Sequence, residues 1–106
     1  MAQFKDVAAA AAFSSDKMKK VNLFDTPRMF CDVYCFEPQQ QQSAHAHADA
    51  DKVYYVISGR GRFTVGDEER DAGAGTAIHA PAGATHAVHN PGPERLQLLV
   101  FMAPKP

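Results

Sequence analysis

Short apolar segments alternate with turn-forming residues along most of the chain, and from Val21 onward the pattern is that of β-strands. Residues 53–57 and 96–102 are rich in strand formers, while Gly66-Asp67 and the Asn-Pro-Gly-Pro run at 90–93 are typical of turns. Residues 39–43 are predicted to be a polar connection. The predicted strands are residues 28–37, 44–50, 53–57, 62–65, 68–70, 76–80, 86–89 and 96–102. Eight or nine short strands with regular turns predict an all-β fold, an antiparallel sandwich or barrel.

The first twenty residues have a different pattern, and we predict that residues 1–20 are a short N-terminal extension. The alanine-rich segment 7–13 predicts a short helix, and Ser15 is expected to cap a second turn over residues 16–20. Asp6 precedes the apolar stretch and polar residues follow it at once, which does not fit a secretory signal peptide. We therefore expect a mature, cytoplasmic protein.

Length and charge limit the classes of function. The chain has 106 residues and a mass of 11.5 kDa, and we predict one domain over residues 1–106. Eleven basic and twelve acidic residues give a formal net charge of −1. This balance supplies no strong field for nucleic acid or an anionic membrane, and no apolar run approaches the ~20 residues of a membrane helix. We expect neither a nucleic-acid nor a membrane partner.

The two cysteines are predicted to be free thiols. Cys31 and Cys35 fall on one side of the predicted strand 28–37, about 13 Å apart, which is beyond the reach of a disulfide. Buried free thiols fit a reducing compartment.

The five histidines all lie between positions 45 and 89. His45 and His47 alternate in a predicted strand, so both imidazoles face one side, about 6.5–7 Å apart, and both can reach one ion. A third ligand from a facing strand would complete a set with open coordination positions. His79 and His89 have the opposite strand parity and are expected to lie at the surface or rim.

Residues 75–90 carry Gly75, Pro81, Gly83, His86 and Asn90 at the spacing of the second motif of the cupin superfamily. His45 to Gly59 resembles the first cupin motif, with His-x-His, a short gap, a strand and a glycine. The two motifs lie 15 residues apart and span residues 45–90. The chain is therefore similar to a small single-domain cupin.

The resemblance implies an all-β antiparallel barrel, or jelly roll, that holds one divalent metal ion. His45, His47 and His86 would be its ligands, and the ion would be iron, nickel, manganese or zinc. Cupins of this size include dioxygenases and isomerases that act on small organic molecules, and many form homodimers. The chain would accordingly be a homodimer that binds a small-molecule ligand or substrate.

One position departs from the family pattern. Where the cupin motif has a glutamate ligand, this chain has Lys52, whose ammonium cannot bind a metal and would be repelled by one. Three outcomes stay open, and we favour them in this order: a three-histidine site completed by water, a site assisted by the carboxylate of Asp51 or Asp49, and a metal-free barrel. Strand parity places Lys52 on the inner face, although its long stem could carry the charge to the rim.

Two classes of function follow. The first is a metal-dependent enzyme of the oxygenase or isomerase type, with Lys52 and Tyr54 lining the substrate pocket and Lys52 holding a substrate carboxylate. The second is a non-catalytic module that binds or senses a small molecule. No residue of the sequence is securely placed as a general acid, so catalytic residues stay unassigned.

Overall fold

The computed structural model describes all 106 residues and contains nine strands and one short helix. The elements in chain order are α1 (Val7–Ala10), β1 (Lys19–Asp25), β2 (Phe30–Phe36), β3 (Gln41–His45), β4 (Asp51–Ser58), β5 (Arg60–Val65), β6 (Glu68–Gly73), β7 (Ala77–Ala80), β8 (His86–His89) and β9 (Leu96–Ala103). The predicted all-β fold is confirmed. No helix in the structure has the length and apolar character needed to cross a membrane.

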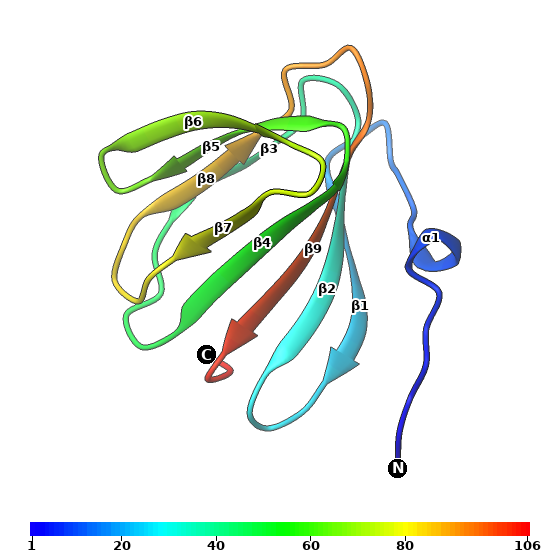
Figure 1. Ribbon diagram of the computed structural model, residues 1–106, viewed down its shortest axis with the longest axis vertical. Coiled ribbons are helices and arrows are strands. Elements are labelled where there is room, and N and C mark those ends of the chain that lie inside the picture. Colours follow the sequence, from blue (N-terminus) through cyan, green and yellow to red (C-terminus); the bar gives the residue numbers. More distant parts are fainter.

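The strands form two facing antiparallel sheets (Figure 1). One has five strands in the order β1-β2-β9-β4-β7, and the other has four in the order β3-β8-β5-β6. Neighbours in a sheet are mostly distant in sequence, as when the last strand, β9, pairs with both β2 and β4. This arrangement is a jelly roll, and its interior lies between the two sheets.

The main hydrophobic core fills the space between the sheets. Alternate residues of β4 and β9 point inward, as their burial patterns show. The largest apolar members of this core are Tyr34, Phe36, Tyr54, Val56, Phe63, Val88, Leu96, Leu98 and Val100. Lys52 belongs to the same inward-facing set of β4, so its predicted inner-face position is confirmed.

A second, smaller core lies on the outer face of the five-stranded sheet. There Leu23, Cys31, Val33 and Cys35 are buried beneath the N-terminal segment, which runs along the outside of β1 in Figure 1. Val7, Ala10 and Phe13 of that segment pack against them. Both cysteines are buried and free, as predicted.

The N-terminal segment differs from its prediction in two places. The helix is a single turn, Val7–Ala10, in which the side chain of Asp6 accepts a hydrogen bond from the Ala9 amide. The prediction of a second turn over residues 16–20 is wrong. Pairing with β2 overrides local turn propensity there, because Lys19 already pairs with Cys35 as β1 begins.

Two further differences affect the region around the histidines. The polar connection predicted over residues 39–43 is wrong at its end, because β3 begins at Gln41 and pairs with His89 of β8. The strand predicted over residues 44–50 is also wrong beyond its first two residues. His45 pairs with His86, the first residue of β8, so β3 ends where its partner ends.

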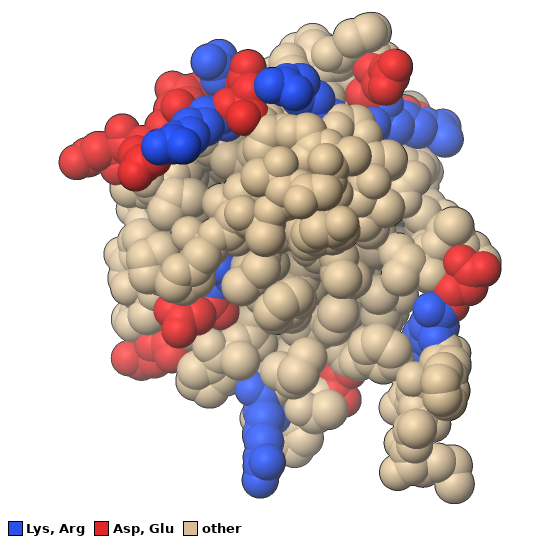
Figure 2. All heavy atoms as spheres, viewed as in Figure 1, with Lys and Arg blue, Asp and Glu red and all other residues tan.

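Charged side chains gather away from the middle of the face shown in Figure 2, and mixed acidic and basic residues crowd along the β5–β6 hairpin. Arg62 lies within ion-pair distance of Glu69 and Asp71, and Arg70 pairs with Glu68. These exposed pairs contribute little stability.

Candidate metal centre

Three histidines meet between the sheets. One ring nitrogen from each lies within 4.8 Å of those from the other two, although His45 ends β3, His47 follows it in a loop and His86 begins β8. The ring centroids of His45 and His86 are 4.2 Å apart, and those of His45 and His47 are 5.1 Å apart. The structure therefore brings together the three residues that the sequence pattern predicted.

His47 reaches the cluster from a loop, not from the strand face that the sequence predicted. A hydrogen bond of 2.8 Å from the Gly83 amide to the His47 carbonyl fixes this loop to the turn that precedes β8. Gly83 has φ of +84°, a backbone conformation that suits glycine. The second motif thus supplies a ligand candidate, His86, and also the turn that anchors His47.

Backbone carbonyls set the tautomers of two of the three rings. His45 Nδ1 lies 2.9 Å from the Ser43 carbonyl oxygen, and His86 Nδ1 lies 3.0 Å from that of Ala84. A carbonyl oxygen only accepts, so each Nδ1 carries the proton and each Nε2 keeps its lone pair. Such bonds orient histidine ligands in metal sites.

The environment keeps the imidazoles neutral. Burial lowers the pKa of all three histidines, and the positive charge of Lys52 lowers each pKa further; for His86 the value falls to about 4. His86 is only 2% exposed, and its Nε2 has no hydrogen-bond partner. An unpartnered, buried, neutral nitrogen beside two others is a donor set that fits a divalent cation.

The candidate fourth ligand, Asp51, is placed elsewhere. Its exposed carboxylate accepts a hydrogen bond from the Ala82 amide at 2.9 Å and lies 3.4 Å from His79 Nε2. These two contacts, the amide first, lower the pKa of Asp51. Asp49 is exposed in the loop before β4, and neither carboxylate belongs to the histidine cluster. Asp51 instead holds the turn after β7.

Lys52 and Tyr54 extend from β4 into the interior beside the cluster. The Lys52 Nζ lies 5.1 Å from the ring centroid of Tyr54 and 5.1 Å from that of Tyr34, and the side chain does not reach the rim. The Tyr54 ring centroid is 6.1 Å from that of His86. Tyr54 thus contacts both the Lys52 ammonium and His86.

Sequence reasoning missed Gln42 and Tyr34. Gln42 lies three residues before His45, which in a regular strand would place the two side chains on opposite faces. A register shift between Gln42 and His45 turns both inward. No signal in the sequence marks this bulge. Tyr34 could have been found from the inward parity of its strand.

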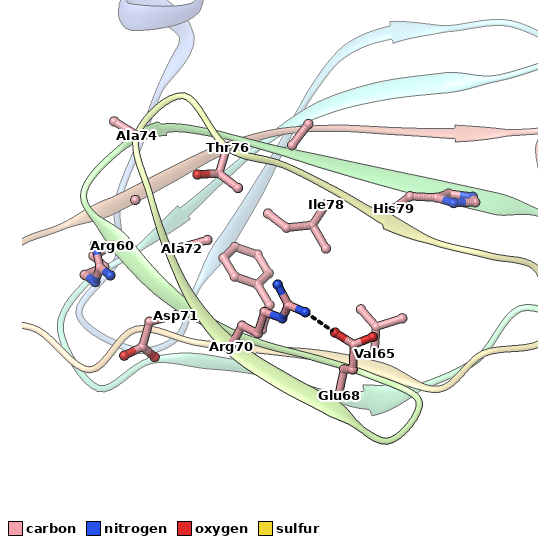
Figure 3. Close-up of a pocket in the computed structure, with 13 residues that line it drawn as sticks. Arg60, Val65, Glu68, Arg70, Asp71, Ala72, Ala74, Thr76, Ile78 and His79 are labelled. Carbon is pink, nitrogen blue, oxygen red and sulfur yellow. Dashed lines mark ion pairs between the residues drawn. The ribbon is translucent and has the colours of Figure 1, made fainter.

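The main surface cavity lies apart from this centre. It has a volume of about 740 Å³ and lies between the β5–β6 hairpin and β7, with Val65, Ala72 and Ile78 among its lining residues (Figure 3). A second cavity of about 390 Å³ lies over β3, β5 and β8. None of the three clustered histidines lines either cavity, and His79 and His89, which do, lie outside the cluster.

Comparison with known proteins agrees with the fold. The family model described as the cupin domain matches residues 32–102, two thirds of the chain. This protein therefore belongs to the cupin family.

Individual relatives are similar to this chain in fold or in sequence. The crystal structure of TT1209 from Thermus thermophilus superposes with a TM-score of 0.94 at 41% identity, over 97% of this chain and 98% of that one. A protein with a double-stranded β-helix domain from Klebsiella pneumoniae has a TM-score of 0.90 at 23% identity, over 98% and 91% of the two chains, and shows the fold alone. An uncharacterised protein of Streptomyces coelicolor is 34% identical over 73 residues, 69% of each chain.

Proposed function

We propose that this cupin is a metal-dependent enzyme that binds one divalent ion through His45, His47 and His86 and acts on a small organic molecule. Two observations together carry the proposal: one ring nitrogen of each histidine lies within 4.8 Å of those of the other two, and the buried Nε2 of His86 has no hydrogen-bond partner. A divalent ion held by three imidazoles keeps open positions and acts as a Lewis acid toward bound oxygen groups. Iron, nickel, manganese and zinc all suit imidazole ligands.

The chain's own residues prepare the site for this role. The Ser43 and Ala84 carbonyls hold two rings in the tautomer that presents Nε2. Burial keeps the rings neutral, so no proton has to leave before an ion binds. Tyr54 packs edge-on to His86 and closes the interior on the side of the core. The other side of the cluster, where His45 and His47 are half-buried, is left for water and substrate.

Metal content tests the first half of the proposal. We expect about one ion per chain in the wild type by elemental analysis, and none in the triple variant His45→Ala, His47→Ala, His86→Ala. The matched control is His79→Ala with His89→Ala, which removes two histidines outside the cluster and should keep the ion. A wild type that stays metal-free after reconstitution, or a triple variant that keeps full metal content, would overturn the site.

Turnover tests the second half. Iron-loaded protein is incubated with small hydroxy and oxo acids, while oxygen consumption and product formation are followed. Oxygen uptake that depends on His47 indicates an oxygenase, and conversion without uptake indicates an isomerase. Saturable binding with no conversion would instead identify the second class of function, a non-catalytic small-molecule-binding module, which the absence of a securely placed general acid favours.

A further inference from the structure

Lys52 is an ammonium group buried without an acidic partner. Its side chain is 1% exposed, and its Nζ lies against the rings of Tyr34 and Tyr54. No carboxylate oxygen lies within ion-pair distance of it, and it forms no hydrogen bond with another side chain. Contact with aromatic faces offsets only part of the cost of burying a charge. The Lys52 ammonium is therefore able to bind an anion.

Gln42 supplies a second unused donor in the same interior. Its Oε1 accepts a hydrogen bond of 3.1 Å from the Tyr54 hydroxyl. Its buried Nε2 forms no hydrogen bond of good geometry and has only a weaker contact with the Tyr34 phenol, which acts to lower the pKa of Tyr34 against the larger effect of burial. Gln42 is 7% exposed and comes from β3, on the sheet opposite Lys52. Lys52 and Gln42 thus reach Tyr54 from facing sheets, and the Nε2 of Gln42 is a buried donor without a good acceptor, which is uncommon in folded proteins.

The balance of charge around these donors is positive. Lys20 is a second cation beside the interior, because its Nζ lies 5.3 Å from the ring centroid of Tyr34, which the Nζ of Lys52 also contacts. The one acid that acts on Lys52 in the opposite sense is Asp32, whose carboxylate accepts a hydrogen bond of 2.8 Å from Asn22. A divalent ion on the histidines would increase the positive excess, so a ligand that enters here gains by being an anion.

We propose that Lys52 and Gln42 bind the carboxylate of a small acid whose second oxygen faces the three histidines. The ligand class is a carboxylate with an adjacent oxygen group: a 2-hydroxy acid, a 2-oxo acid or a short dicarboxylate. A planar carboxylate offers acceptors to both donors at once, and charge-assisted hydrogen bonds are the strong ones. Lys52 lines neither surface cavity, whereas Gln42 is among the residues that line the second one. The metal end of this inference rests on the function proposed above.

Glycolate and its neutral counterpart glycolamide are suitable probes, because they share the hydroxyl and differ in the carboxylate. Zinc-loaded wild type, Lys52→Met and the control Lys19→Met are titrated by NMR. Lys19→Met removes the same charge from an exposed position. We expect glycolate to bind the wild type and Lys19→Met equally and Lys52→Met at least about tenfold more weakly, a loss of about 1.4 kcal/mol. Glycolamide should bind all three weakly and alike.

A measurement on the wild type covers the case in which Lys52→Met does not fold. The side-chain ¹³Cε and ¹⁵Nζ signals of Lys52 should shift on addition of glycolate and stay in place with glycolamide. The inference would be overturned if the Lys52 signals of the zinc-loaded wild type did not shift with glycolate, or if Lys52→Met bound glycolate with wild-type affinity. Neither result would contradict the metal site. Lys52-dependent glycolate binding by a protein that takes up no metal would overturn the proposed function and leave the anion site standing.

Discussion

Lys52 determines the electrostatics of the interior at the scale of single residues. It occupies an inward position of β4 between two tyrosine rings, and its charge acts on all three histidines. A fixed cation weakens the binding of a neighbouring divalent ion by Coulomb repulsion and strengthens the binding of an anion. The same side chain can therefore lower metal affinity and select the ligand.

A charge series at position 52 separates these effects. Metal affinity should rise in the order wild type, Lys52→Met, Lys52→Glu, because the neighbouring charge changes from positive to neutral to negative. Each step should be worth about tenfold or more in Kd, measured by competition with a chromophoric chelator. Lys52→Glu without metal should melt below the wild type, since it buries a carboxylate beside Tyr34 and Tyr54, and should recover when zinc is added. Equal affinities across the series would show that Lys52 does not act on the metal.

Lys52 also gives the metal-free protein a distinctive dependence of stability on pH. Burial lowers the pKa of Lys52 to about 8, and the charge of Lys20 lowers it as well. Between this pKa and the unfolded value of about 10.4, the unfolded chain binds more protons, so the free energy of unfolding rises with pH. The stability that Lys52 contributes at high pH is lost as pH falls from the unfolded pKa of about 10.4 to the folded pKa of about 8.

Urea unfolding from pH 7.5 to 9.5 measures the effect. Relative to Lys52→Met, the wild type should gain about 2 kcal/mol across this range. The comparison cancels groups that titrate alike in both proteins, and burial keeps Tyr34 protonated by raising its pKa to about 12. Parallel curves for the two proteins would mean that Lys52 has an ordinary pKa.

At the scale of elements, the turns that contain Gly59 and Gly83 have different structural roles. Gly59 joins β4 to β5 with φ of +83°, and a Cβ there would overlap the backbone carbonyl of Arg95. Gly83 has nearly the same φ but open space around it, and its amide holds the loop of His47. The left-handed backbone conformation alone costs an alanine about 1–2 kcal/mol. At Gly59 the overlap with the backbone would add to this cost.

Alanine at each position distinguishes the two. Gly59→Ala should lower the free energy of unfolding by more than about 3 kcal/mol, and Gly83→Ala by about 1–2 kcal/mol, in urea titrations. Gly83→Ala should also weaken metal binding, because the shifted turn moves the His47 loop. A Gly83→Ala protein with wild-type metal affinity would show that the turn does not position His47.

The elements also show how far the sequence predicts this molecule. Strand formers and turn residues predicted β4, the β5–β6 hairpin, β8 and β9, because their inward and outward residues alternate with the pleat. The beginning of β1 and the end of β3 depend on which strands they pair with, and pairing is not encoded locally. The three histidines followed from motif spacing, whereas Gln42 joined the interior through a bulge that leaves no trace in the sequence.

At the scale of the whole molecule, the outer face of the five-stranded sheet is only partly covered. The N-terminal segment shields the β1–β2 side, while Tyr55 and Phe101, on the neighbouring strands β4 and β9, are 41% and 38% exposed. Apolar side chains left exposed together on a sheet face are typical of an interface. We propose that this face pairs two copies of the chain.

Light scattering coupled to size exclusion tests this pairing. The wild type should have twice the chain mass of 11.5 kDa, and Phe101→Glu should run as a monomer, because pairing would bury a carboxylate at a two-fold contact that repeats it on both copies. Gln41→Glu adds the same charge on the other sheet and should leave the dimer intact. Metal content should be equal in all three proteins, since every residue of the histidine cluster comes from one chain. A wild type that is monomeric at every concentration, or a dimer that Phe101→Glu does not dissociate, would exclude this face as the contact.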